Sequence, residues 1–195
     1  QKNVADQVAT GTTTIFDVSV TGLAPKTEAH VIPFFEQVGF KPEQLEQRIG
    51  FIRQHLEKFN DRKFGLSPHT PYTTLPAYFQ FANQNAKHLM IHLSESEYEE
   101  PFLEKRTGPL AKFLQSLGLN VPESDSLIPK KRGWQLLKDY GIDFKKTMLV
   151  HANYLTPQEM QEVGESGATV VICPRCHSFF NHSQKPWIQM INRNV

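Results

Sequence analysis

The hydrophobic positions of this chain form short continuous runs, separated by longer segments with amphipathic spacing. Six runs have the length of buried strands and lie near residues 12–19, 30–35, 62–67, 89–93, 147–151 and 168–173. Between the runs, apolar residues recur at helical spacing, as at Leu45, Ile49, Ile52 and Leu56. Strands that are apolar throughout, rather than alternating, are typical of a parallel sheet covered on both faces. The chain is therefore predicted to be an α/β protein in which strands and helices alternate.

Some helix boundaries are marked by their own residues. Thr156-Pro157-Gln158-Glu159 predicts a helix start, with Thr as the N-cap, Pro at the first helical position and Glu completing a capping box. This helix is expected to end at Gly164 or Gly167. Further helices are expected near residues 1–11, 41–56, 75–86, 108–117, 133–140 and 188–192. The acidic residues 97–104 are expected at the surface, and residues 118–132 form the longest predicted irregular segment.

Composition and charge narrow the class of protein. The 195 residues are enough for one domain with a sizeable core. The net charge of +1 provides no basic field for nucleic-acid binding, and no apolar run is long enough to span a membrane. Neither a nucleic acid nor a membrane is therefore expected as a partner. The two cysteines, Cys173 and Cys176, are too few for a disulfide framework, so a reducing cytoplasm is the predicted location.

A histidine stands at the carboxyl end of each of three successive predicted strands. These histidines are His69, His92 and His151. In a parallel α/β barrel, the carboxyl ends of all strands open on one face, which is where the chemistry is located. A single histidine at a strand end is more often a structural residue, but three in equivalent positions favour a shared site.

His92 and Glu95 form the most informative pair. Histidine is the commonest metal-ligating side chain, and a nearby carboxylate that is not a ligand can carry protons for an activated water. The pattern predicts a metal ligand at His92 and a general acid/base at Glu95. The alternative makes Glu95 one of several solvated carboxylates in residues 95–100. His151 is expected to bind the metal or orient the attacking water, and the alternative is a hydrogen bond to a neighbouring loop.

Cys173-Pro174-Arg175-Cys176 admits other interpretations. C-x-x-C can be half of a zinc site or a redox pair, and it faintly resembles the P-C-x-x-C of zinc nucleobase deaminases. That signature pairs H-x-E with a proline before the first cysteine, whereas here the upstream motif is H-x-x-E and the proline lies inside the pair. We therefore expect Cys173 to pack at a strand end and Arg175 to be a structural or substrate-facing cation.

Five stretches together resemble the amidohydrolase superfamily, in particular its chlorohydrolase and aminodeoxyfutalosine-deaminase-like branch. They follow the family's order over almost the whole chain, at residues 11–17 (GTTTIFD), 65–72 (GLSPHTPY), 91–95 (IHLSE), 149–155 (LVHANYL) and 170–175 (VVICPR). The resemblance implies a (β/α)8 barrel of the TIM type. It also implies one divalent metal ion, zinc or alternatively iron, that activates water for attack on a C–N or similar bond.

The resemblance also assigns roles. His92 matches the family's fifth-strand metal ligand and Glu95 its proton-shuttling acid/base. His151 matches the sixth-strand histidine that positions or polarises the water, and His69 a fourth-strand histidine that contacts the substrate in some deaminases. With Arg175 as a second substrate-binding residue, the implied reaction is deamination of an amino-substituted heterocycle or nucleoside-like small molecule. Amide or C–Cl hydrolysis stays open, as does a non-catalytic truncated barrel that binds a ligand or partner.

Two departures from the family pattern concern the metal ligands. The first-strand His-x-His and the eighth-strand Asp are not in this sequence. Residues 1–6 contain neither methionine nor the apolar core of a signal peptide. We therefore expect an internal fragment, a single incomplete barrel domain over residues 1–195 with about strands two to seven of eight. Alone it is expected to be inactive and poorly soluble, because metal ligands are missing and strand edges are bare. The sequence leaves open whether the protein forms a homo-oligomer.

Overall fold

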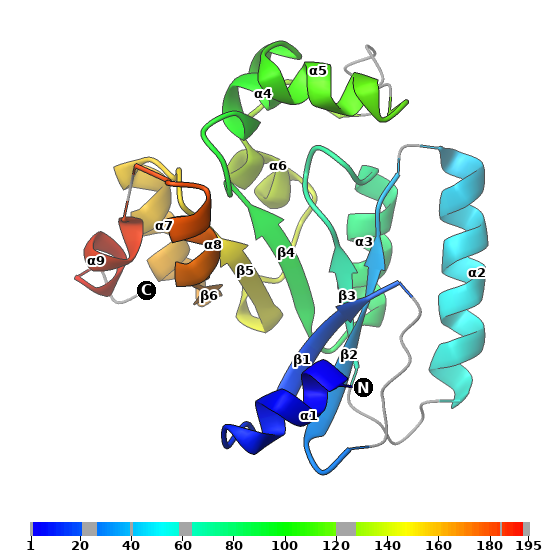
Figure 1. The fold of residues 1–195 in the computed structure, drawn as a ribbon. Helices are drawn as coiled ribbons and strands as arrows, with labels where there is room; N and C mark the ends of the chain where they lie inside the picture. The colour runs from blue at the N-terminus through cyan, green and yellow to red at the C-terminus, as the bar shows by residue number, and fades with distance from the viewer. Residues whose placement is uncertain are drawn as a thin grey trace.

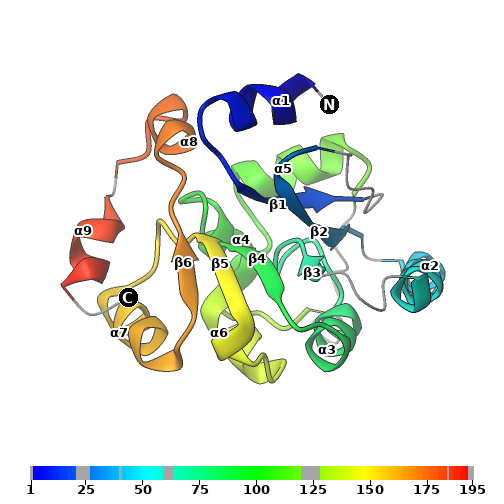
Figure 2. The same cartoon turned by 90° about the horizontal axis from the view of Figure 1, so that it is seen from below.

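A single parallel sheet organises the fold. The computed structural model describes residues 2–20, 27–39, 41–58, 64–119, 128–183 and 185–192. Within them, six strands lie side by side in chain order and every neighbouring pair is parallel. Strands β1 to β6 span Thr14–Ser19, His30–Gln37, Gly65–Pro68, Leu89–Leu93, Thr147–His151 and Thr169–Val171. The sheet curls into a half-barrel with helices along its outer side (Figures 1 and 2), which confirms the predicted partial α/β barrel.

The helices α1 to α9 alternate with the strands or follow them. They span Lys2–Ala9, Pro42–Lys58, Pro76–Asn85, Glu99–Lys105, Pro109–Ser116, Gly133–Asp139, Pro157–Ser166, Pro174–Phe179 and Pro186–Ile191. Six of them begin at a proline, whose ring fixes a helical φ where no backbone donor is needed. Helix α7 has the predicted capping box, and Gly167 ends it in a left-handed conformation. Among the described helices, none has both the length and the apolar character needed to cross a membrane.

Alternation along the strands divides the apolar side chains into two layers. The larger layer packs strand residues such as Leu66, Ile91 and Leu149 against the helices. The smaller layer consists of strand residues on the opposite, inner face of the sheet: Ile32, Phe34, Met90 and Val150. Because successive side chains point to opposite faces, the next inward positions after Phe34 and Met90 are Glu36 and His92. The strand pattern therefore places two polar side chains on the inner face, at the carboxyl ends of β2 and β4.

The acidic stretch at 97–104 differs from the expectation. It forms helix α4, which was not predicted, and Glu99 and Glu100 are only 3% and 4% exposed rather than solvated. The reason is that both carboxyl groups accept hydrogen bonds from backbone N–H groups, from Ser96 for Glu99 and from Gly133 for Glu100. Such bonds offset the cost of burying polar groups, and the Gly133 partner of Glu100 lies 33 positions away, where no local pattern reveals it.

The C-terminal part of the fold differs from the expectation at β6 and at α8. Strand β6 is shorter than expected, and Val170 and Val171 are half-buried, because β6 pairs with β5 alone among the described strands. Helix α8 was not predicted. The expected start of a strand at residues 62–63 and most of the expected irregular segment, residues 120–127, lie outside the described residues.

The contact between β2 and β3 leads to a stability prediction. A Cβ added at Gly65 would lie 2.1 Å from the buried Phe34 ring, so Gly65→Ala should destabilise the fold by about 1–3 kcal/mol. Gly50, inside α2, has open space, and Gly50→Ala should instead stabilise by about 0.5–1 kcal/mol. Urea unfolding of both variants provides the measurement, and equal midpoints for the two would contradict the packing argument.

Candidate active site

The three strand-end histidines lie side by side on neighbouring strands. The ring centroids of His69 and His92 are 5.0 Å apart, and those of His92 and His151 are 5.7 Å apart. One carboxylate oxygen of Glu95 lies 3.3 Å from Nε2 of His151. Backbone hydrogen bonds join the same strand ends, since the His92 N–H donates to the His69 carbonyl at 2.9 Å. The structure thus brings together the four side chains that the sequence placed at one end of the sheet.

The backbone at this end of the sheet adopts an unusual conformation. Ser94, His151 and Ala152 have φ angles of +49°, +75° and +52°. Positive φ is uncommon for residues other than glycine, and it costs energy that active sites often store. His151 pairs with the helix-facing Leu93, so strand alternation alone would turn its side chain outward. The left-handed turn interrupts this alternation, and the imidazole contacts His92 instead.

The loop after β4 is held so that Glu95 stays beside His151. The side-chain amide of Asn153 donates to the Glu95 carbonyl at 3.0 Å, which ties this loop to the one after β5. The Ser96 N–H donates to the Glu99 carboxyl group at 3.0 Å, which ties it to α4. The Glu95 side chain is 34% exposed, whereas that of His151 is 9% exposed. A carboxylate with partial access to solvent next to a buried imidazole can exchange protons with a bound reactant.

Hydrogen bonds of two buried carboxyl groups hold the loop that carries Glu95. Burial raises the pKa of Glu99 to about 8. Burial also raises the pKa of Glu100, which accepts hydrogen bonds from the Ser94 hydroxyl and from the Gly133 N–H. Arg132 lies 3.9 Å from Glu100 and forms two hydrogen bonds with Glu159, at 2.7 and 2.8 Å. These contacts connect the loop that carries Glu95 to α6 and α7.

The electrostatic environment keeps two of the histidines neutral. Burial, together with the neighbouring His92 and His151, lowers the pKa of His69 to about 4. Burial also lowers the pKa of His151, and the opposing effect of Glu95 is smaller. Nδ1 of His92 lies 3.2 Å from the His69 carbonyl oxygen. Because a carbonyl only accepts, Nδ1 carries the hydrogen in this contact, and Nε2 of a neutral His92 is left with its lone pair.

A carboxylate that we did not predict joins the histidines. Glu36, at the end of β2, offers an oxygen to a group with His69 and His92 in which the potential ligand atoms all lie within 4.8 Å of one another. Imidazole nitrogens and carboxylate oxygens are ligands that zinc and iron accept, so these residues fit a divalent cation. The signal in the sequence was the position of Glu36 directly after a buried apolar run, which is also where the histidines stand.

The C-x-x-C segment lies at the end of β6. Cys173 packs half-buried against the inner layer, and burial raises the pKa of its thiol. Cys176 is exposed, and both cysteines are free thiols. Arg175 is exposed on the first turn of α8, and none of the contacts that join Glu36, the histidines and Glu95 includes it.

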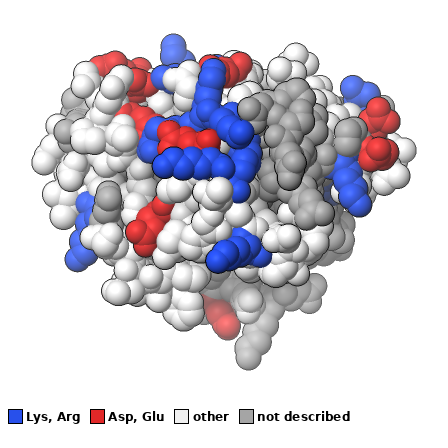
Figure 3. All heavy atoms as spheres, turned by 90° about the horizontal axis from the view of Figure 1, so that it is seen from above, with Lys and Arg blue, Asp and Glu red and all other residues white. Residues whose placement is uncertain are grey.

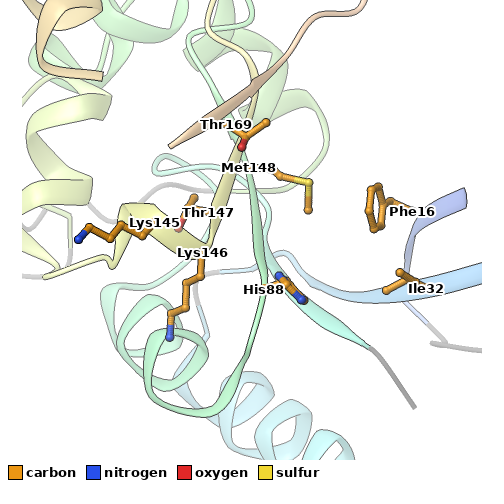
Figure 4. Close-up of a pocket in the computed structure, with 8 residues that line it drawn as sticks. All are labelled: Phe16, Ile32, His88, Lys145, Lys146, Thr147, Met148 and Thr169. Atoms are coloured by element: carbon orange, nitrogen blue, oxygen red, sulfur yellow. The ribbon is translucent and has the colours of Figure 1, made fainter. Parts of the chain in front are cut away.

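A cavity at the opposite end of the strands offers a different set of side chains. It has a volume of about 330 Å³ and includes Phe16, His88, Lys146 and Met148 in its lining. Figure 4 shows Lys145 and Lys146 pointing away from Phe16 and Met148, and the Lys146 ammonium donates to the Ala86 carbonyl at 3.1 Å. In barrels of this type the chemistry occurs at the carboxyl ends of the strands, so this cavity is the weaker candidate.

The face seen from above carries both acidic and basic side chains rather than charges of one sign (Figure 3). There, basic side chains surround acidic ones in one cluster, and much of the remaining described surface is uncharged (Figure 3).

Comparison with known proteins finds deaminases among the proteins similar to this chain. No family model matches the chain. It is 25% identical over 169 residues to the aminodeoxyfutalosine deaminase of Deinococcus radiodurans, covering 79% of this chain and 40% of that protein. It is 27% identical over 113 residues to 5-methylthioadenosine/S-adenosylhomocysteine deaminase 2 of Archaeoglobus fulgidus, covering 56% of this chain and 22% of that protein. The chain thus spans less than half the length of these relatives.

Solved structures share the fold. The aminofutalosine deaminase of Helicobacter pylori in complex with methylthio-coformycin aligns with a TM-score of 0.69 and 20% identity, over 88% of this chain and 44% of that chain. An atrazine chlorohydrolase variant from Arthrobacter aurescens, complexed with zinc and atraton, aligns with a TM-score of 0.72 and 10% identity. The alignment covers 98% of this chain and 45% of that chain. These homologues are all of the amidohydrolase superfamily, so the resemblance seen in the sequence is confirmed.

Proposed function

We propose that this chain is part of a metal-dependent hydrolase that deaminates an amino-substituted heterocycle or a nucleoside-like substrate. The observation that carries the proposal is the contact of Glu95 with His151, and of His151 with His92, at the carboxyl ends of parallel strands. The similarity to two kinds of deaminase supports hydrolytic attack at a carbon that bears an amino group.

The residues present fit a divalent metal, for which zinc or iron is proposed. His92 would hold it, because Nε2 is left with its lone pair while Nδ1 donates to the His69 carbonyl. A cation bound there would supply Lewis-acid activation of a water molecule. The chlorohydrolase neighbour complexed with zinc is consistent with this choice.

Glu95 and His151 would carry out the proton and charge steps. Glu95 accepts a proton from the attacking water and then delivers it to the departing nitrogen, which leaves as ammonia. His151, 3.3 Å from Glu95, stabilises the charge that develops on the attacked ring. His69 would contact the substrate from the adjacent strand. Arg175 is proposed to face the substrate from α8, where its exposure leaves it free to do so.

Product analysis tests this function. The chain within a complete barrel, supplied with zinc or iron, should release ammonia from amino-substituted nucleosides or heterocycles. Release of chloride or of a carboxylate instead would identify hydrolysis of a C–Cl or amide bond by the same residues. Ligand binding without any product would support a non-catalytic barrel. We propose that residues 1–195 alone are inactive, which the same assay on the isolated chain measures.

A further inference from the structure

We propose that Cys173 and Cys176 form a reversible disulfide by exchange with small disulfides of the glutathione type, and that this bond lowers the activity of the adjacent site. Both cysteines are free thiols in the structure, which therefore describes the reduced form of the pair. Formation of the disulfide is independent of the proposed function, whereas its effect on turnover rests on that function.

The two cysteines stand at the start of α8, which follows β6 closely in the chain (Figures 1 and 2). Cys173 is the N-cap residue, and the His177 N–H donates to its carbonyl at 3.0 Å, as in the first turn of a helix. Cβ atoms three residues apart on a helix are separated by about 5–6 Å, and a disulfide needs about 3.5–4.5 Å. Because Cys173 has the non-helical angles φ −113° and ψ 77°, rotation at this residue can close the difference while α8 stays wound.

The exposure of the two thiols assigns their order in the exchange. Cys176 is exposed, so its thiolate attacks the small disulfide, forms a mixed disulfide and releases one small thiolate. Cys173 is half-buried against the inner layer and reacts second. Its thiolate attacks the sulfur of Cys176, the mixed bond breaks, and the second small thiol leaves. Overall, the chain loses two hydrogen atoms and the small disulfide becomes two thiols.

A zinc site is the other chemistry open to a C-x-x-C segment, and the structure does not favour it. Among the described residues, the group that could hold a metal ion consists of Glu36, His69 and His92, and neither cysteine belongs to it. The sequence has no cysteine beyond this pair. Where a reducing compartment contains disulfides, they are usually transient and serve catalysis or redox sensing.

The pair is coupled to the end of the sheet where the histidines lie. Glu95 is close enough to raise the pKa of the Cys173 thiol, an effect that adds to that of burial. The Tyr154 hydroxyl lies 3.0 Å from Nδ1 of His182, which ties the segment after α8 to the loop after β5. Drawing the Cys173 thiol toward its partner would therefore shift groups that face Glu95. A misplacement of about 1 Å in a site can cost about 10²-fold in rate.

Equilibration of the folded chain with glutathione and glutathione disulfide tests the bond, with mass spectrometry as the readout. We expect the unmodified chain to lose two hydrogen atoms and dithiothreitol to restore them. Trypsin cleaves after Arg175, so the peptides on its two sides should stay joined until they are reduced. Cys176→Ser should abolish the disulfide, whereas Cys173→Ser should trap a glutathione adduct on Cys176.

The unmodified chain in concentrated urea is the matched control for the role of the fold. The folded chain should be half oxidised at a lower proportion of glutathione disulfide than the unfolded one, because the first turn of α8 holds the two thiols close together. Equal proportions for the two states, or glutathione adducts on the folded chain without an internal disulfide, would overturn the proposal.

Turnover of the complete barrel tests the effect on the site. Oxidation should lower ammonia release reversibly, by up to about 10²-fold, and Cys176→Ser should make turnover insensitive to glutathione disulfide. Equal turnover of the oxidised and reduced forms would overturn the effect on activity. Absence of ammonia release from both forms, with the disulfide present in one, would instead refute the proposed function and leave the disulfide established.

Discussion

Glu95→Gln should lower kcat of the complete barrel by about 10²–10⁴-fold while the metal content stays unchanged. The carboxylate lies 3.3 Å from His151 and outside the group of Glu36, His69 and His92, so the amide would retain the shape of the site. It could not accept a proton from water or return one to the leaving nitrogen. Turnover measured together with metal content per chain tests both halves of this expectation.

His92→Ala provides the matched comparison for that experiment. It removes the imidazole whose Nε2 we assign to the metal, so the metal should be lost first and activity with it. Loss of metal from the Gln variant would show that Glu95 is itself a ligand, and the proton-carrying role would then be wrong.

The contribution of Glu99 to stability should fall as pH rises from about 4.5 to about 8, and Glu99→Gln should remove this contribution. Burial raises the pKa of Glu99 from 4.5 to about 8. Between these values the folded chain keeps a proton that the unfolded chain has lost. The contribution of Glu99 is therefore fully present below pH 4.5 and declines as pH approaches 8, by at most about 1.4 kcal/mol per pH unit. Glutamine cannot ionise, and its amide oxygen can still accept from the Ser96 N–H.

Urea unfolding at several values between pH 5 and pH 8 measures this dependence. Glu97→Gln is the control, because Glu97 is exposed two positions before Glu99 and its replacement should leave the pH dependence as it is. If the Glu99 variant and the unmodified chain show the same slope of unfolding free energy against pH, the buried carboxyl group is not its source.

The strands and their histidines could be predicted because their signals are local. A continuous apolar run identifies a buried strand, and the residue that follows it lies at the carboxyl end of the sheet, as with His69 and His92. The same rule applies to Glu36 after β2. It went unrecognised because glutamates are most often solvated, and because nothing in the sequence shows that β2 and β4 bring Glu36 and His92 together.

The burial of Glu100 could not be predicted from neighbouring residues alone. Glu100 is satisfied by the Gly133 N–H, 33 positions further along the chain. An acidic run with no visible partner is therefore easily taken for surface. The conformation of His151 was hidden for a related reason. Its positive φ interrupts the strand alternation, and the turn depends on hydrogen bonds to the loop after β4.

The chain-order arrangement of the sheet has a consequence for how the site is assembled. Each strand pairs with the strand before it in sequence, so strands can be added one at a time at the growing edge of the sheet. Contacts between consecutive units are shorter in sequence than those of a reordered sheet, which favours faster folding. During synthesis, the residues of β2, β3 and β4 can meet before β5 has left the ribosome. Glu36, His69 and His92 would then lie together in the nascent chain before His151 is added to the site.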